Sequence, residues 1–189
     1  MRHSTGGCLL VLFLAGLSTG VTETRALPAP LDQEEYLDAE DWFRAGVAFN
    51  NAGKYREASE AFARSIAVDP ENPVAWLNLG TAQALAADYA EAVASLRKAV
   101  RLDPTLAIGY ANLGEIYLRT GRFGEALEVY SALIALLPDD PAAHYKRGLA
   151  YLYLADTAKA QAEYLRLKTL DPELAGKLLQ SINQGVTDK

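Results

Sequence analysis

The sequence is poor in cysteine, histidine and positive charge, and each shortage excludes a class of function. Its single cysteine, Cys8, lies in an apolar N-terminal segment, so the rest of the chain holds no thiol for a disulfide, a thiolate metal site or a cysteine nucleophile. The 189 residues carry 18 Lys and Arg against 24 Asp and Glu, a net charge of −6. Nucleic-acid binding needs a basic surface that displaces counterions from phosphates, so we expect no nucleic-acid partner.

The two histidines, His3 and His144, belong to no catalytic or metal-binding pattern. The sequence contains no zinc-ligand spacing and no glycine-rich loop of the kind that holds phosphates. We therefore predict that the protein is not an enzyme and that it has no cofactor and no metal site. His144 occupies a packing position of the repeat described below, where we expect a core residue with one hydrogen-bonded ring nitrogen.

Residues 1–20 have the layout of a secretory signal peptide. Arg2 precedes the apolar run Cys8–Leu17, and small residues follow. As a helix this run spans ~15 Å, about half the hydrocarbon core of a bilayer, which argues against a transmembrane helix. We expect cleavage after Gly20, with Ala26 as an alternative, and hence an exported protein: periplasmic in a bacterium, otherwise in the secretory lumen or extracellular. An uncleaved segment would be a marginal membrane anchor.

Residues 21–38 are expected to be a linker followed by an acidic lead-in. Carboxylates crowd the stretch 32–41, where they would offset the positive end of a helix macrodipole. Asp38 is placed to cap a helix that begins at the next residue. An acidic patch for a basic partner is the less favoured interpretation of the same residues.

The main signal in the sequence is internal repetition. Pro70, Pro104, Pro138 and Pro172 follow one another at intervals of 34 residues. They divide the chain into four units, 39–72, 73–106, 107–140 and 141–174. Small residues recur at the eighth and twentieth places of each unit, where we expect two helix backbones to approach closely. These residues are Gly46, Gly80, Gly114 and Gly148, and Ala58, Ala92, Ala126 and Ala160.

This length and these anchor residues resemble the tetratricopeptide repeat. The resemblance implies an all-α fold, an α-solenoid of four helix-turn-helix units, with a capping helix over about 173–184 and a short tail in the segment 175–189. Gly53 and Gly121 are expected to end the first helices of their units in left-handed backbone. The sequence departs from the family pattern at Ala45, Gln83, His144 and Arg147.

The resemblance also implies where a partner would bind, because the first helix of each unit lines the concave side of such a solenoid. We expect Phe43, Leu77 and Tyr145 to be solvent-facing anchors, whereas Leu118 and Leu152 could pack against neighbouring units. The residues expected to line the groove are Phe43, Val47, Asn50, Leu77, Asn78, Thr81, Leu85, Ile108, Asn112, Glu115, Arg119, Tyr145, Lys146, Leu149 and Tyr153.

Asn78 and Asn112 occupy the same place in successive units and leave two interpretations open. They resemble the asparagine ladder with which some family members hold the backbone of a partner peptide, since an amide both donates and accepts hydrogen bonds. Alternatively, they form local hydrogen bonds within a helix pair. A clamp for a chaperone C-terminus is not implied, because Phe43 and Val47 stand where that clamp needs lysine and asparagine.

The sequence therefore predicts an exported adaptor that holds an extended or helical segment of another protein in an apolar groove. A self-assembling scaffold of an envelope complex, and hence a homo-oligomer, is the first alternative. A degenerate carrier domain beside an enzyme is the second. Membrane contact is expected only if the N-terminal segment is not cleaved.

Overall fold

The structure, a computed structural model, describes residues 38–184. The predicted signal peptide, the linker and acidic lead-in up to residue 37, and residues 185–189 lie outside the described part. Residues 38–184 form nine α-helices and no strand: α1 Ala39–Asn51, α2 Tyr55–Val68, α3 Pro73–Leu85, α4 Tyr89–Leu102, α5 Ala107–Arg119, α6 Phe123–Leu136, α7 Pro141–Tyr153, α8 Thr157–Leu170 and α9 Pro172–Gln184.

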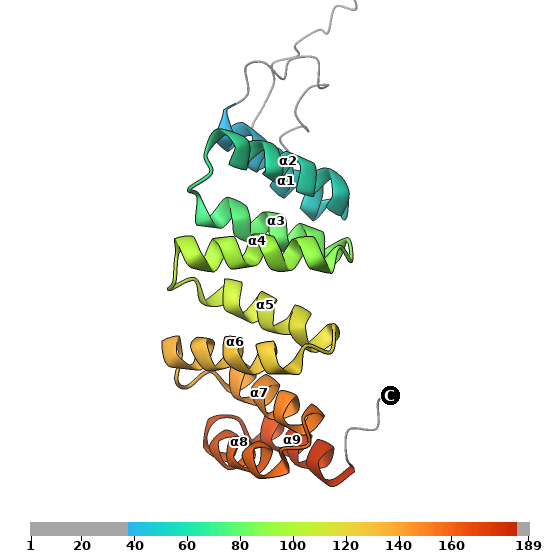
Figure 1. Ribbon diagram of the computed structural model, residues 1–189, viewed down its shortest axis with the longest axis vertical. Helices are drawn as coiled ribbons and strands as arrows, with labels where there is room; N and C mark the ends of the chain where they lie inside the picture. Colours follow the sequence, from blue (N-terminus) through green and yellow to red (C-terminus); the bar gives the residue numbers. More distant parts are fainter. Residues whose placement is uncertain (1–37, 185–189) are drawn as a thin grey trace, which may run out of the picture.

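The helices stack as pairs along one long axis, from α1 at one end to α9 at the other (Figure 1). The turns inside the pairs lie along one edge of the stack, and the connections between pairs lie along the opposite edge. Contacts are local, because each helix packs mainly against its neighbours in the sequence. The predicted all-α solenoid of four helix pairs with a C-terminal capping helix is confirmed.

Three of the four pairs begin at a capping side chain. Asp38 accepts a hydrogen bond from the backbone N–H of Asp41 at 2.8 Å, as predicted. Asn72 and Asp140 cap α3 and α7 in the same way, and a proline follows each of them. Helix α5 differs, because Leu106 precedes it and supplies no capping side chain.

The first helices of the units end in left-handed backbone. Gly53 and Gly121 both have φ of 73°, as predicted. The equivalent residues of the other two units are alanines, Ala87 with φ of 68° and Ala155 with φ of 59°. Because a β-carbon makes this conformation costly, by roughly 1–2 kcal/mol, the two alanines are held there by the turns around them.

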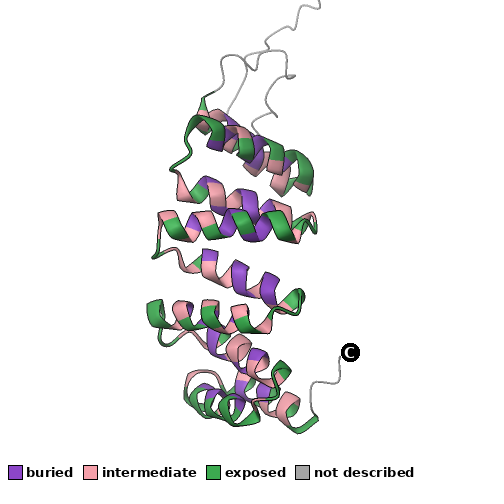
Figure 2. Cartoon of the chain, viewed as in Figure 1, coloured by how far each residue is buried: buried purple, intermediate pink, exposed green. Residues whose placement is uncertain are grey.

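The recurring small residues allow close packing between paired helices. A β-carbon built on Gly46 would lie 2.6 Å from the ring of Phe62, and one on Gly114 would lie 2.6 Å from Tyr130. The recurring alanine of each unit is fully buried. Buried residues line the faces where the helices meet, whereas the turns are mostly exposed (Figure 2).

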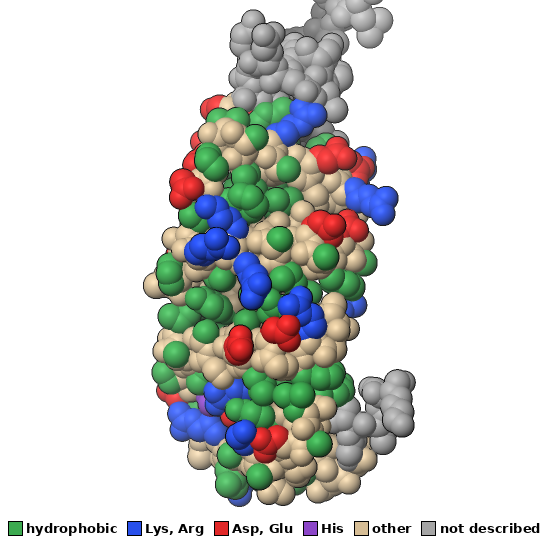
Figure 3. Space-filling view, in the orientation of Figure 1, with side chains coloured by type: hydrophobic (Ala, Val, Ile, Leu, Met, Phe, Trp, Pro, Cys, Tyr) green, Lys and Arg blue, Asp and Glu red, His purple; other side chains and the backbone are tan. Residues whose placement is uncertain are grey.

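The face drawn in Figure 3 carries Lys and Arg side chains interspersed with Asp, Glu and hydrophobic ones. Within residues 38–184, none of the helices combines the length and the apolar character needed to cross a membrane.

Candidate protein-binding surface

The predicted groove residues all lie on the first helices of the four units, but their exposure differs. Leu77 is only 9% exposed and belongs to the same buried cluster as Leu113 and Tyr117 of the next unit. The prediction that Leu77 is a solvent-facing anchor is therefore wrong. The cause is the stacking of the repeats, which turns this side chain toward the following unit instead of toward solvent.

Four other apolar residues of the predicted groove are half-buried by neighbouring helices. Phe43 packs with Val47 against the cluster between α2 and α3, and its ring lies 5.5 Å from that of Phe62. Tyr145 and Leu149 pack against the cluster that α8 and α9 form. Phe43 and Tyr145 therefore contribute to the core, and neither is the free anchor that the sequence suggested.

The exposed apolar side chains of this face lie along two lines. Val74 and Ile108, 44% and 57% exposed, are the second residues of α3 and α5. Leu85 and Tyr153, 51% and 37% exposed, are the last residues of α3 and α7. Arg119, the last residue of α5, is also exposed. We call Leu85, Arg119 and Tyr153 the turn rim, because each precedes the turn inside its unit.

Polar residues bridge successive units between these lines. Asn112 Nδ2 donates to Thr81 Oγ1 at 3.0 Å, and Lys146 Nζ donates to Glu115 Oε2 at 2.7 Å. Both contacts join the sixth residue of one unit to the ninth residue of the unit before it. They therefore fix neighbouring first helices relative to each other across the floor of the face.

The two asparagines use their donors inside the protein. Asn78 Nδ2 donates to the carbonyl of Val74 at 2.8 Å, and Asn112 Nδ2 donates to Thr81. The bond of Asn78 agrees with the local hydrogen bonds that were one of the two interpretations, whereas the bond of Asn112 reaches the preceding unit and is not local to one helix pair. No partner within residues 38–184 is found for Oδ1 of either residue, so both can still accept from a bound backbone. Asn50 is half-buried, and its Oδ1 also lacks a partner there.

Aromatic side chains of the second helices contact two of the three turn-rim residues. The guanidinium carbon of Arg119 lies 5.7 Å from the ring centroid of Tyr89. The ring of Tyr153 stacks on Phe123, with centroids 4.3 Å apart and planes 3° from parallel. Each contact joins the last residue of a first helix to the first residue of the second helix in the preceding unit. Sequence reasoning missed Tyr89 and Phe123, although Tyr55, Tyr89 and Phe123 recur at intervals of 34 residues.

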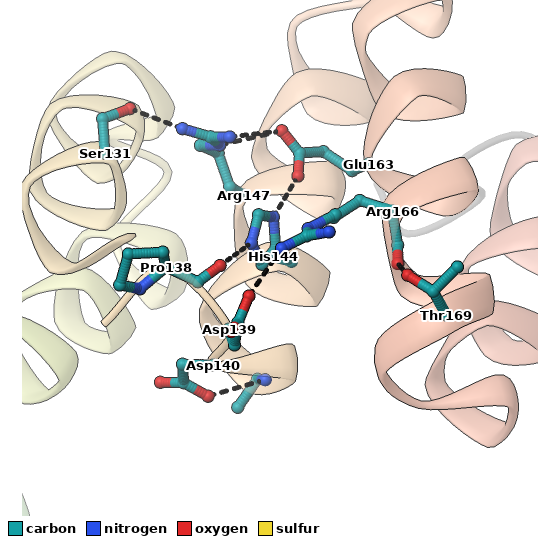
Figure 4. A network of polar contacts seen from close by, with 10 residues as sticks. Ser131, Pro138, Asp139, Asp140, His144, Arg147, Glu163, Arg166 and Thr169 are labelled. Atoms are coloured by element: carbon teal, nitrogen blue, oxygen red, sulfur yellow. Dashed lines mark hydrogen bonds and ion pairs between the residues drawn. The ribbon is translucent and has the colours of Figure 1, made fainter. Parts of the chain in front are cut away.

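A second polar arrangement joins α7 and α8 of unit 4 and reaches the end of unit 3 (Figure 4). His144 Nδ1 lies 2.7 Å from Glu163 Oε2, and Arg147 Nε donates to Glu163 Oε1 at 2.9 Å. We call His144, Arg147 and Glu163 the unit 4 network. His144 and Glu163 are 5% and 6% exposed. His144 is a core residue, as predicted.

The prediction that only one ring nitrogen of His144 is hydrogen-bonded is wrong. Its Nε2 lies 2.9 Å from the carbonyl oxygen of Pro138, in the loop that leads into unit 4. Arg147 Nη1 donates to Ser131 Oγ on α6 at 3.2 Å. The network thus joins α7 and α8 to unit 3, which is a structural role.

The comparisons with known sequences fit this architecture. Models of the tetratricopeptide repeat match residues 43–107, 95–128 and 141–174, and a TPR-repeat model matches residues 114–154. Together the matches extend over 43–174, more than half of the chain. Among curated protein sequences there is no match.

Three solved structures show the same fold. MamA from Desulfovibrio magneticus is 21% identical, with a TM-score of 0.67 over 77% of this chain and 93% of that chain. YrrB, described as a TPR protein with an unusual peptide-binding site, is 24% identical, with a TM-score of 0.69 over 75% of this chain and 74% of that one.

The third is the first TPR domain of Spaghetti (RPAP3) bound to an HSP90 peptide, which is 24% identical, with a TM-score of 0.60 over 62% of this chain and 94% of that chain. The sequence models and the stacked helix pairs lead to the same assignment. The chain belongs to the tetratricopeptide-repeat family.

Proposed function

We propose that this protein is an exported adaptor that binds a segment of another protein on the face formed by the first helices of its four units. It performs no chemistry on that segment. Binding would use apolar contacts at the edges of the face and hydrogen bonds to the polar floor between them.

One observation carries the proposal: large apolar side chains remain exposed along both edges of this face. Val74, Leu85, Ile108 and Tyr153 are between 37% and 57% exposed and recur at two places of the repeat. Scattered single apolar residues are common on protein surfaces, but a contiguous group of them is typical of an interaction site. Because the repeats stack, Val74 and Ile108 are at one place of successive units. Leu85 and Tyr153 are at another place, in units 2 and 4, with Arg119 of unit 3 between them.

The related structures support a peptide as the kind of ligand. The RPAP3 domain is bound to an HSP90 peptide, and the description of YrrB names a peptide-binding site. Export is supported by the sequence of residues 1–20 alone, and fractionation of cells followed by N-terminal sequencing of the purified chain tests it. We expect the mature chain to begin at residue 21.

The binding face is tested by replacing the two apolar residues of the turn rim. The double variant Leu85→Glu with Tyr153→Glu should lose the partners that the full-length chain captures from its own envelope fraction, measured by quantitative mass spectrometry. Glu91→Lys on α4 is the control, because that residue is exposed on a second helix. Helix content should be unchanged in both variants.

Two outcomes would contradict the proposal. Loss of the same partners in Glu91→Lys but not in the double variant would place binding on the second helices. A chain that captures only copies of itself, and that light scattering shows to be a defined oligomer, would favour the self-assembling scaffold.

A further inference from the structure

Arg119 differs from the other cations of the first-helix face because no carboxylate within residues 38–184 pairs with it. Arg44 Nη2 lies 2.8 Å from Asp41 Oδ1, and Lys146 Nζ lies 2.7 Å from Glu115 Oε2. The contact found for Arg119 is with the ring of Tyr89. An aromatic ring attracts a guanidinium but does not neutralise its charge. Arg119 is thus the one cation of this face, among the described residues, that remains available to an acidic group.

The turn rim holds Arg119 between two exposed apolar side chains. Leu85, Arg119 and Tyr153 are equivalent residues of units 2, 3 and 4, so they follow one another along the solenoid. Contacts between successive units restrict two of them, Arg119 against Tyr89 and Tyr153 against Phe123. The rim therefore presents an aliphatic, a cationic and an aromatic side chain in a fixed order before any partner arrives.

We propose that the turn rim recognises an acidic side chain, Asp or Glu, that lies between two apolar side chains of an extended partner segment. The inference rests on the proposed function and names the chemistry of its partner. A guanidinium can hold a carboxylate through two parallel hydrogen bonds, which gives both strength and direction. The apolar residues of the partner pack on Leu85 and Tyr153.

The floor of the face and the spacing of the repeats favour an extended segment. The Oδ1 atoms of Asn78 and Asn112 can accept hydrogen bonds from backbone N–H groups, which an extended chain exposes and a helix does not. Directly packed helices lie roughly 8–10 Å apart, and successive first helices, which make few direct contacts, lie at least that far apart. An extended chain advances about 3.3 Å per residue, so the acidic residue and each apolar residue should be at least about three positions apart.

The charge of the whole chain makes this recognition selective. The protein carries a net charge of −6, so it repels a strongly acidic partner. Arg119, which has no carboxylate partner within residues 38–184, attracts an acidic group at one position of the face, although the chain as a whole repels acidic groups. The expected partner therefore has one acidic residue at this position and no run of them.

The test uses a phage-displayed library of random dodecapeptides, selected on the full-length chain and on the variants Arg119→Glu and Arg97→Glu. In such a library the peptide C-terminus is fused to the coat protein, so any acidic preference comes from side chains. Arg97 is the matched control, because it is also exposed and lies on a second helix, α4. The wild-type chain and Arg97→Glu should enrich peptides with one Asp or Glu between apolar residues.

The Arg119→Glu variant should enrich Lys or Arg at the same position. For a synthetic peptide of the enriched sequence, Arg119→Gln should weaken binding at least about tenfold, as loss of one hydrogen bond between charged groups predicts. Thermal unfolding of each variant checks that the solenoid is intact.

Two other outcomes are possible, and they contradict different claims. Enriched peptides that lack an acidic residue, or that bind Arg119→Glu as well as the wild type, contradict this inference alone, provided that Leu85→Glu with Tyr153→Glu still abolishes their binding. Absence of any enriched peptide on the wild-type chain contradicts the proposed function, and the inference fails with it.

Discussion

Units 1 and 4 fill the same three places of the repeat with opposite chemistry. In unit 1 the fourth, seventh and twenty-third residues are Trp42, Ala45 and Ala61, which form one buried apolar cluster. In unit 4 the equivalent residues are the unit 4 network, a histidine and an arginine that both contact one carboxylate. The repeat therefore determines which three side chains contact one another in the core of a unit. These side chains can be apolar or polar, provided that all three are of matching chemistry.

In unit 2 an uncharged pair of polar residues replaces apolar packing between the two helices. Gln83 stands where the repeat usually has an aromatic residue, and its Oε1 accepts a hydrogen bond from Ser95 Oγ at 2.7 Å. Ser95 occupies the place that Glu163 has in unit 4. The polar departures from the family pattern, Gln83, His144 and Arg147, each have a polar partner on the second helix of the same unit, because a buried polar group needs a partner.

Removing one member of the unit 4 network should have the largest effect on stability. In Glu163→Ala, Arg147 and His144 lose their acceptor in the core, and the free energy of unfolding should fall by about 3–5 kcal/mol. Urea denaturation followed by circular dichroism measures this. The control Glu60→Ala removes an exposed carboxylate from α2 and should change stability by less than about 0.5 kcal/mol. Equal effects of the two variants would show that the network contributes nothing.

Converting the whole network to the residues of unit 1 should cost much less than removing one member. The triple variant His144→Trp, Arg147→Ala and Glu163→Ala leaves no unpaired charge and restores an apolar cluster. We expect its free energy of unfolding to lie within about 2 kcal/mol of the wild type, or above it, because apolar replacement of a buried ion network is often neutral or stabilising. A loss equal to the sum of the single variants would contradict the coupling.

The turn inside each unit allows a third comparison of units 1 and 4, with a smaller expected effect on stability. Unit 1 has Gly53 and unit 4 has Ala155 in left-handed backbone. Ala155→Gly should raise the free energy of unfolding by up to about 1 kcal/mol because it relieves this strain, and Gly53→Ala should lower it by about the same amount. Thermal unfolding of both variants measures the two shifts. Shifts of the same sign would contradict this account of the turns.

Much of the fold was predictable because the same packing constraint recurs in every unit. Glycine at the eighth place is required wherever two helices approach closely, so the period and the helix pairs could be read from residues such as Gly46 and Gly114. The capping role of Asp38 was predictable for a similar reason, since a helix end needs a local hydrogen-bond acceptor.

The exposure of side chains on the first-helix face was less predictable, because it depends on contacts between units. Leu77 and Ile108 were both expected to line the groove, yet one is 9% exposed and the other 57%. The pairs that hold the turn rim, such as Phe123 with Tyr153, join residues of different units. A pattern derived from one unit at a time does not contain such contacts.

Site-specific photocrosslinking tests the central claim, binding on the first-helix face, most directly. A benzophenone amino acid is placed at Tyr153 on the turn rim or, in a second variant, at Leu165 on α8, which is 61% exposed and belongs to a second helix. The account predicts a covalent adduct with a partner protein from position 153 and none from position 165. Adducts formed at position 165 and absent at position 153 would contradict it.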